Sequence, residues 1–590
     1  MRILAFLFGL LPFLLNAQTN VRLSNSEALS VLKGIGTAQY NTGTASSVDQ
    51  SICDLEAAIN ADTLENYLFN LTSYHNRNTF SDTNGNNIGI GPARRWAMSK
   101  FKSFDPAGDR MVFSYLDFDV IGHACGDVSA RNVLAIRPGI EGSEVVLIEA
   151  HLDSRCGTRC DPNCKANGAD DNGSGSVLVL ELARVLNQLE SKQTLVFMLT
   201  VGEEQGLLGG RAFSDLCVDN DINIRAVFNN DIVGGVMCGE TASPPTVCAA
   251  EGNVDSTRLR IFASPLGTLG NRNLARWVKL NYEEKLAGNV EVPMQIQIMN
   301  QEDRTGRGGD HIPFREDGFN AIRFTSAVEH GNGSGDNDPN YHDRQHSEDD
   351  VIGADTDNNG SIDSFYVDFN YLARNSAVNA LSMIVAANAP KTPSFSVETS
   401  SGKPEIVVSE PSSGPYDFRL GVYTLGSTDT IYQFDKLYRF QGTNRFEVPG
   451  LENGKAYFVQ LAQVSGSMTS VFSGGQLLIA ASDTDPAVED VLTETLNCQT
   501  LSNEEVENES GIQISPNPTS SQLNIRLTDV GEYEFWEVRL RDMKGSNVHI
   551  SSFSGKSEVS LNLSLFARGT YLCQVIRAGK VVHNERIVKP

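Results

Sequence analysis

Residues 145–153 read Val-Val-Leu-Ile-Glu-Ala-His-Leu-Asp, a short apolar run that ends in polar residues. Its first four residues have the length and composition of a buried β-strand. Similar apolar runs follow at 195–199 and 224–228, and the apolar residues within 178–189 fall on one face of a helix that Ser174 is placed to cap. Strand, helix and strand in this order predict an α/β domain whose mixed, largely parallel sheet is flanked by helices.

The length, composition and charge of the chain limit its number of domains, its structural class and its partners. Its 590 residues are about four times the ~150 residues of a typical domain, so more than one domain is expected. Hydrophobic residues make up 40% and charged residues 20%, as in globular rather than disordered or fibrous proteins. Because 73 Asp and Glu outnumber 47 Lys and Arg, for a net charge of −26, no nucleic acid partner is expected.

The first 17 residues have the pattern of a secretory signal peptide. Arg2 precedes an apolar run from Ile3 to Leu15, and Ala17 offers a cleavage site before Gln18. The run is shorter than the roughly 20 residues that cross a bilayer, and no later segment is apolar enough to do so. We therefore expect an exported mature chain that has no transmembrane segment and is allowed to form disulfides.

Polar side chains follow each of the three apolar runs. His151 and Asp153 follow the first run, Glu203 and Glu204 the second, and Asp231 the third. In open α/β sheets, ligand groups gather just beyond the carboxyl ends of the strands. One crevice should therefore collect all five side chains.

The turn at 168–175, Gly-Ala-Asp-Asp-Asn-Gly-Ser-Gly, adds further carboxylates between the first two runs. So many carboxylates cannot share a cleft without a counter-charge, because neighbouring like charges raise each other's pKa. A divalent cation is the simplest counter-charge, and imidazole together with carboxylate oxygens suits zinc.

These segments resemble the secreted zinc aminopeptidases in which one aspartate bridges two metal ions. The matching segments are His151-Leu152-Asp153, Gly168–Gly175, Glu203–Gly209, Asn230-Asp231 and Arg307–Phe314. The resemblance covers roughly residues 56–389. It implies the zinc exopeptidase fold, two zinc ions and peptide substrates that are cut after their N-terminal residue.

The resemblance also implies which residues hold the metals. His151 and Asp231 would bind one zinc ion, Glu204 and a later histidine would bind the other, and Asp171 would bridge both. Asp171 takes this role rather than Asp170, because the family's aspartate directly precedes the Asn-Gly-Ser-Gly turn.

Two further residues would serve the reaction itself. Asp153 would orient His151. Glu203 would act as the general base, taking a proton from a water between the two metals and passing it to the leaving amine.

The histidine of the second metal position has two candidates. The family usually shows Tyr-His-Thr followed closely by Asp-Thr, whereas residues 341–350 read Tyr-His-Asp-Arg-Gln-His-Ser-Glu-Asp-Asp. His342 keeps the preceding tyrosine, and His346 keeps a following serine and an aspartate four residues later. We favour His346.

Three cysteines, Cys156, Cys160 and Cys164, lie between two of the ligand motifs. In an exported protein, disulfides at the rim of the crevice are favoured over a cysteine metal site. Because three is an odd number, at least one partner lies elsewhere, and the sequence leaves the pairing open. The candidate partners are Cys53, Cys125, Cys217, Cys238 and Cys248.

Residues 355–363 have the oxygen-ligand spacing and the turn glycine of a calcium-binding loop. The twelfth position is Tyr366 instead of the usual glutamate, so a complete helix-loop-helix site is absent. A calcium site at Asp355–Asp363 is therefore a possibility that competes with a plain acidic turn.

Changes in sequence texture predict the domain boundaries. Near the start, apolar residues recur at helix-like spacing, and predicted strands then alternate with predicted helices. Toward the end, short segments of alternating apolar and polar residues, separated by turn residues, indicate small β-sandwiches. The expected parts are a signal peptide at 1–17, a helical N-terminal part at 18–118, the catalytic α/β domain at 119–389, a β domain at 394–482, an acidic linker at 483–511 and a second β domain at 512–590.

Both β domains resemble known modules. The first is similar to a fibronectin type III domain, chiefly at Val448–Val459. The second is similar to the sorting domain of the type nine secretion system, at Ile514–Thr519, Gly569–Leu572 and Val588–Pro590. This implies export through the periplasm and across the outer membrane by that machinery, followed by release or attachment to the cell surface.

Three other functions compete with the aminopeptidase hypothesis. Glutaminyl cyclases share the fold but use a single zinc ion, and carboxypeptidases or dipeptidases of the same fold cut other bonds. A third alternative is a secreted adhesion or carbohydrate-binding protein with an inactive α/β domain. The presence of every candidate ligand type argues against this last alternative.

Overall fold

The computed structural model describes residues 18–40, 47–240, 248, 250–264, 270–328, 331, 343–400, 402–411, 416–424, 434–485, 495–498, 511–519, 521–527, 535–542, 547–564, 566–577 and 580–589. The chain forms two compact units, residues 1–496 and 497–590, and each is described by itself. The expected signal peptide, most of the expected acidic linker and His342 lie outside the described residues.

A nine-stranded mixed sheet organises the first unit, in the order β1-β2-β3-β5-β4-β6-β9-β7-β8. The four central strands β5, β4, β6 and β9 are parallel, and β7 pairs in parallel with β8, whereas the pairings of β1, β2 and β3 and of β7 with β9 are antiparallel. The strands are β1 (Gln18–Leu23), β2 (Val112–Val120), β3 (Val128–Arg137), β4 (Val145–His151), β5 (Thr194–Thr200), β6 (Ile224–Asn230), β7 (Arg258–Phe262), β8 (Gln295–Met299) and β9 (Ala321–Ser326). The predicted mixed α/β sheet is confirmed, with its parallel part at the centre.

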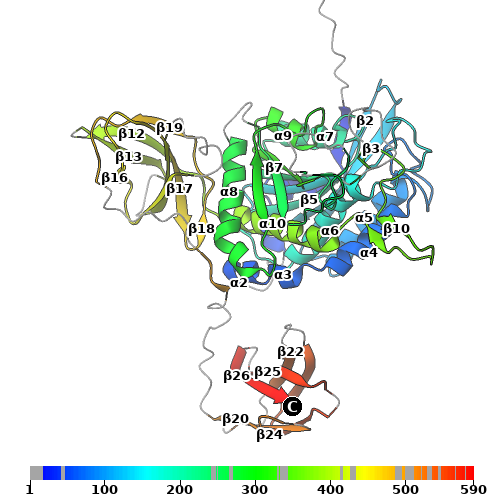
Figure 1. Ribbon diagram of the computed structural model, residues 1–590, viewed down its shortest axis with the longest axis vertical. Helices are drawn as coiled ribbons and strands as arrows, with labels where there is room; N and C mark the ends of the chain where they lie inside the picture. Colours follow the sequence, from blue (N-terminus) through cyan, green and yellow to red (C-terminus); the bar gives the residue numbers. More distant parts are fainter. Residues whose placement is uncertain are drawn as a thin grey trace, which may run out of the picture. The chain divides into compact units, whose positions relative to one another are not determined.

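Helices cover both faces of this sheet (Figure 1). Helices α5, α6 and α10 pack on one face, with α4 against α6 and α10, while α9 packs on β6 and β9 of the other face with α7 beside it. The helices are α1 (Ser26–Leu32), α2 (Val48–Cys53), α3 (Leu55–Ala58), α4 (Ala61–Thr72), α5 (Ile90–Phe104), α6 (Gly175–Leu186), α7 (Leu208–Asp219), α8 (Gly270–Lys285), α9 (His311–Glu316) and α10 (Phe369–Asn388). Every residue of β4 and β5 is buried, which explains why these strands are continuous apolar runs.

The region 18–118, predicted to be mainly helical, contains α1 to α5 but also contributes β1 and most of β2 to the sheet. Strand β2 buries alternate residues, beginning with Val112 and ending with Val120. This period of two is the strand signal that the helical expectation missed. Ser174 also differs from expectation, because it has helical backbone angles and its hydroxyl donates to the Asp170 carbonyl at 2.8 Å instead of capping α6.

A β-sandwich follows α10 within the first unit. Its two sheets have the strand orders β12-β13-β16 and β15-β14-β17-β18, with β19 paired to β17. The strands are β12 (Ser394–Ser400), β13 (Lys403–Glu410), β14 (Asp417–Thr424), β15 (Lys436–Phe440), β16 (Arg445–Glu447), β17 (Ala456–Ser465), β18 (Met468–Thr469) and β19 (Gln476–Ile479). The predicted β architecture is present, and the likeness to fibronectin type III remains a prediction.

The sandwich is fixed to α8 of the α/β domain by buried polar contacts. Arg419 of β14 donates to both carboxylate oxygens of Glu284, at 2.9 and 2.6 Å, and both side chains are almost fully buried. The Trp277 indole donates to the Thr469 carbonyl at 2.8 Å. The sandwich and the α/β domain are therefore parts of one packed body.

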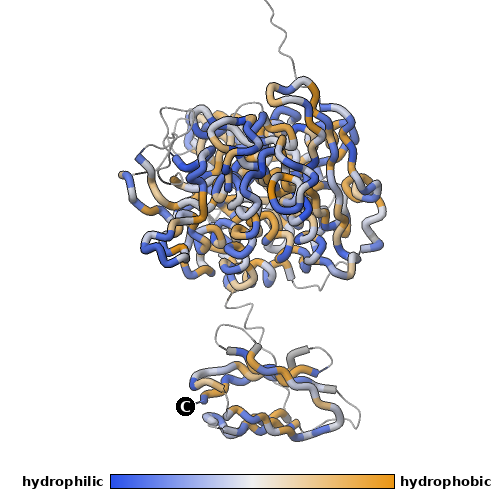
Figure 2. Tube along the Cα trace, turned by 90° about the vertical axis from the view of Figure 1, so that its right-hand side faces the viewer, coloured by the Kyte–Doolittle hydropathy of each residue, from blue (hydrophilic) through white to orange (hydrophobic). Residues whose placement is uncertain are grey.

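The second unit is a smaller pair of antiparallel sheets, with the strand orders β20-β21-β24 and β23-β22-β25-β26. Hydrophobic and hydrophilic residues alternate along its strands (Figure 2), and the apolar side chains, including Trp536, meet between the sheets. The strands are β20 (Ile512–Ser515), β21 (Gln522–Leu527), β22 (Phe535–Asp542), β23 (Asn547–Ser554), β24 (Glu558–Asn562), β25 (Gly569–Arg577) and β26 (Lys580–Lys589). Within the described ranges, none of the helices in the chain combines the length and apolar character needed to cross a bilayer.

The buried Arg419–Glu284 pair gives a test of the rigid attachment. Replacing Arg419 with Met leaves a buried carboxylate without its partner and should lower the free energy of unfolding of the first unit by about 3–5 kcal/mol. The double variant Arg419→Met, Glu284→Met should recover most of this loss, because both charges are then removed. Chemical denaturation of the three proteins measures the effect, and an unchanged stability of Arg419→Met would contradict the attachment.

Candidate metal centre

The carboxyl ends of the central strands bring the predicted side chains to one edge of the sheet. His151 is the last residue of β4, Asp231 directly follows β6, and Glu203 and Glu204 lie in the turn after β5. These three strands are parallel neighbours, so their ends meet as expected.

The segment after Gly168 places Asp171 between these strand ends. Gly168 has a φ of 54°, and the backbone angles of Asp171 interrupt the one-turn π-helix η2 (Ala169–Ser174). The carboxylate of Asp350 accepts the backbone N–H groups of Asp170 and Asp171, at 2.8 and 3.0 Å. The Asp170 side chain points elsewhere and accepts the N–H groups of Gly234 and the residue after it, at 2.9 and 3.0 Å. Asp170 therefore anchors the loop, and Asp171 faces the cluster.

Two groups of potential ligands share the carboxylate of Asp171. In the first group, His151 Nε2 lies 3.2 Å from Asp171 Oδ1 and 3.6 Å from Asp231 Oδ1. In the second group, His346 Nε2 lies 3.1 Å from Asp171 Oδ2 and 3.3 Å from Glu204 Oε2. Each group of three could hold one metal ion.

The chemistry of these groups fits zinc. His151 Nε2 and Glu204 Oε1 are buried and have no hydrogen-bond partner within the described part of the chain. Unpartnered buried polar atoms are costly, so two such atoms facing the same cluster indicate a missing partner. Imidazole nitrogens and carboxylate oxygens are ligands that zinc accepts.

Burial and mutual charge shift the pKa values across the cluster. Burial alone would lower the pKa of His151, but the carboxylates of Asp231 and Glu203 raise it well above its ordinary value. Burial would raise the pKa of Asp171, yet its close contacts with His151 and His346 hold it well below its ordinary value. For Glu203, burial prevails and its pKa is raised well above the usual range.

Several neighbours hold the candidate ligands in place. The backbone carbonyl of Asp153 lies 3.1 Å from His151 Nδ1, while the Asp153 carboxylate is 3.6 Å from that nitrogen and accepts the Glu204 N–H at 3.3 Å. Asp153 thus contacts His151 mainly through its main-chain carbonyl, and its role in orienting His151 remains a prediction. Arg323 pairs with Asp231 at 2.9 Å.

Glu203 and Glu204 both face the same cavity, although they are adjacent. The chain turns directly after β5, and the Glu203 carbonyl accepts the N–H groups of Gly206 and Leu207, at 2.8 and 3.0 Å. The cavity has a volume of about 240 Å³ and is lined by Asp171, Glu203, Glu204, Asp231 and His346, together with other residues considered below. The Glu203 side chain is 12% exposed, and its Oε2 lies 4.0 Å from His151 Nε2.

Sequence reasoning missed the basic and acidic residues that surround the cluster. Arg155 contacts Glu204 at 2.8 Å, and Asp310 is fully buried beside Thr200. Burial raises the pKa of Asp310 to about 7. Asp310 and Arg307 stand in the 307–314 segment that carried the family resemblance, but nothing in their spacing distinguishes such supporting residues from surface charges.

Disulfides line the neighbouring loop, as predicted. Cys156 pairs with Cys164, and Cys160 pairs with Cys125, so the expected partner outside the triplet is Cys125. A third disulfide joins Cys238 and Cys248. Because Cys156 and Cys164 are bonded to each other, they are not metal ligands.

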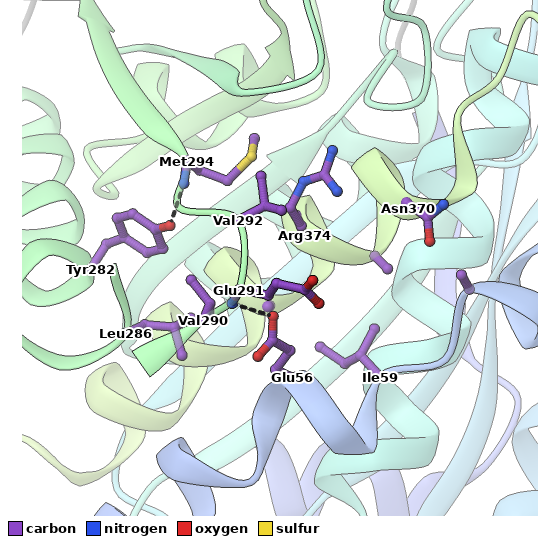
Figure 3. Close-up of a pocket in the computed structure, with 13 residues that line it drawn as sticks. Glu56, Ile59, Tyr282, Leu286, Val290, Glu291, Val292, Met294, Asn370 and Arg374 are labelled. Carbon is purple, nitrogen blue, oxygen red and sulfur yellow. Dashed lines mark hydrogen bonds between the residues drawn. The ribbon is translucent and has the colours of Figure 1, made fainter. Parts of the chain in front are cut away.

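Two features lie apart from this centre. Carboxylate oxygens of Asp355, Asp357 and Asp363 lie within 4.8 Å of one another, and calcium binding there remains a prediction. A separate cavity of about 370 Å³ is lined mainly by apolar side chains, with Glu56 accepting the Glu291 N–H at 2.9 Å (Figure 3). It contains none of the candidate ligands.

Comparisons with known proteins agree with this geometry. The profile of peptidase family M28 matches residues 132–365, and that of the secretion system C-terminal sorting domain matches residues 513–589. A probable zinc metalloprotease of Pyrenophora tritici-repentis (strain Pt-1C-BFP) is 30% identical over 358 residues, which cover 58% of this chain and 78% of that relative. The chain belongs to peptidase family M28. It therefore belongs to a family of zinc metallopeptidases, and its sorting domain marks it for secretion or for the cell surface.

Two solved structures that are similar to this chain are of enzymes with different activities. The Legionella pneumophila LapA aminopeptidase is 18% identical with a TM-score of 0.41, covering 59% of this chain and 76% of its own. The Porphyromonas gingivalis glutaminyl cyclase is 17% identical with a TM-score of 0.38, covering 55% of this chain and 97% of its own.

The raised pKa of His151 predicts that zinc uptake releases protons. The raised pKa means that the metal-free imidazole holds its proton more tightly than an ordinary histidine, whereas a zinc ligand must be unprotonated, so the apparent zinc affinity should increase as the pH rises. Calorimetric titration with zinc in two buffers of different ionisation enthalpy counts the released protons. The His151→Asn variant should release fewer, and pH-independent binding by the wild type would contradict the prediction.

Proposed function

We propose that this M28 peptidase is a two-zinc aminopeptidase that removes N-terminal residues from peptides. The carboxylate of Asp171, shared by two ligand groups, is the observation that carries the proposal. A single-zinc enzyme such as a glutaminyl cyclase needs only one such group, so the shared aspartate favours the peptidase. His151 and Asp231 would hold one ion, and Glu204 and His346 would hold the other.

Two zinc ions in these positions would supply Lewis-acid chemistry, polarising the scissile carbonyl and lowering the pKa of a water molecule. Glu203 is placed to accept the proton of that water. Its carboxylate is largely buried, lies beside His151 and has a raised pKa, which suits a group that takes up a proton and gives it back to the leaving amine.

The cavity supports cleavage at a chain end. Its volume of about 240 Å³ is below the ~300–1,000 Å³ of pockets that enclose drug-sized ligands. A cavity of this size takes one terminal residue more readily than the middle of a folded chain. The free α-amino group of the substrate would lie, in its neutral form, toward the second ligand group, which contains Glu204 and His346.

The Glu203→Gln variant tests the proposed general base. It should keep its zinc but lose hydrolysis of aminoacyl substrates by roughly 100-fold or more, the usual contribution of a positioned acid–base group. Glu348→Gln is the matched control, because Glu348 is exposed on the segment that carries His346. Kinetics and elemental analysis of both variants are compared with the wild type, and full activity of Glu203→Gln would refute the assignment.

A further inference from the structure

The cavity at the metal centre also contains charges that the proposed mechanism does not use. Four arginines line it beside the candidate ligands, and we call them the arginine wall: Arg155, Arg159, Arg304 and Arg307. The chain has 73 acidic and 47 basic residues, so four arginines around one cavity of about 240 Å³ are an unusual local concentration of positive charge. Among the described residues that line this cavity, and apart from its glycines, Leu207 alone is apolar. The wall therefore does not resemble a pocket for a hydrophobic residue.

Two arginines of the wall converge on the second metal position. Arg155 Nη2 lies 2.6 Å from His346 Nδ1, and Arg307 Nη1 lies 3.2 Å from the same nitrogen. A neutral imidazole that binds a cation through Nε2 carries its proton on Nδ1 and cannot accept a hydrogen bond there. With Nδ1 protonated, neither guanidinium group could donate to it, and Arg155 would keep its contact with Glu204, at 2.8 Å, and Arg307 its contact with Asp343, at 3.1 Å.

The other two arginines differ in exposure. Arg304 is buried and donates to Gln345 at 3.1 Å, so it adds positive charge from behind. Arg159 is exposed, and its main chain is fixed because its carbonyl accepts amide groups of Asn78 and Gln205, at 2.9 and 3.3 Å. The disulfide at Cys160 holds the adjacent position.

Small residues leave room in front of the wall. A Cβ atom added at Gly206 or Gly306 would meet nothing within 4 Å. The carboxylates that line the cavity are the candidate zinc ligands and Glu203, and two divalent ions would offset their charge. Asp303 and Asp343 pair with Arg304 and Arg307, at 3.4 and 3.1 Å, so Arg155 and the exposed Arg159 would contribute most of the wall's positive potential toward a substrate.

We propose that the arginine wall binds a carboxylate, so that the preferred substrates carry a carboxylate next to the scissile bond. Guanidinium groups match carboxylates in charge and in hydrogen-bond geometry. The carboxylate is either the acidic side chain of an N-terminal Asp or Glu, or the free C-terminus of a very short peptide. This inference rests on the proposed peptidase function and names its substrate class.

Isosteric substrate pairs distinguish the two sources. Hydrolysis of glutamyl and glutaminyl coumarin amides tests the side chain, and Leu-Leu compared with its C-terminal amide tests the free C-terminus. The charged member of one pair should have a kcat/KM at least about tenfold higher, as expected for a charge-assisted hydrogen bond. N-acetyl-Leu-Leu serves as the control for the proposed function, and its cleavage as fast as Leu-Leu would refute aminopeptidase action.

A binding measurement tests whether the arginine wall binds a carboxylate even when no substrate is hydrolysed. Calorimetry with glutarate and its neutral diamide is carried out on the zinc-loaded wild type, Arg159→Ala, Arg307→Ala and the control Arg445→Ala, whose side chain is exposed in the β-sandwich. Zinc content is measured for each protein. Glutarate should bind several-fold more weakly to the two wall variants at unchanged zinc content, while Arg445→Ala should bind like the wild type.

The outcomes separate the two proposals. If glutamine and glutamate derivatives are cut equally well and glutarate binding does not depend on Arg159 or Arg307, the wall only balances the ligand carboxylates and the inference is wrong, although the peptidase proposal stands. If no substrate is cut but glutarate binding needs both arginines, the peptidase proposal fails and the carboxylate site stands.

Discussion

The carboxylate of Asp171 lies between two imidazoles, 3.2 Å from His151 Nε2 and 3.1 Å from His346 Nε2, and the remainder of the site is arranged around it. Placing it there brings it close to Asp231 and Glu204 in a buried space, where like charges repel and burial disfavours each ion. The fold offsets this cost with fixed partners. Asp350 and Asp170 hold the loop through backbone N–H groups, and Arg323 pairs with Asp231.

These partners come from distant parts of the chain. The Asp171 loop follows β4, Arg323 belongs to β9, and Asp350 and His346 belong to a segment that comes after β9. Only the folded α/β domain brings these segments of the chain together at one site. The disulfides at Cys156 and Cys160 restrain the loop that contributes Arg155 and Arg159 to the same cavity.

Much of this arrangement could be predicted from the sequence. Buried parallel strands appear as continuous apolar runs, and the carboxyl ends of neighbouring parallel strands lie at the same edge of the sheet. That reasoning placed His151, Glu203, Glu204 and Asp231 in one crevice, where the structure has them. It missed β1 and β2 because strands near the edge of the sheet, with one less buried face, have a weaker sequence signal than fully buried strands. It also missed the arginine wall, because long basic side chains carry no periodicity and their direction depends on tertiary packing.

The roles of the ligands depend on one physical claim, that two zinc ions lie on either side of Asp171. X-ray diffraction at the zinc absorption edge, on crystals of the zinc-loaded protein, tests it directly. The account predicts two anomalous peaks roughly 3.5–4 Å apart, one beside His151 and Asp231 and the other beside Glu204 and His346. The two-zinc claim would be contradicted by a single peak or by the absence of any peak next to Asp171. It would also be contradicted by a second peak that lies beside His342 instead of His346.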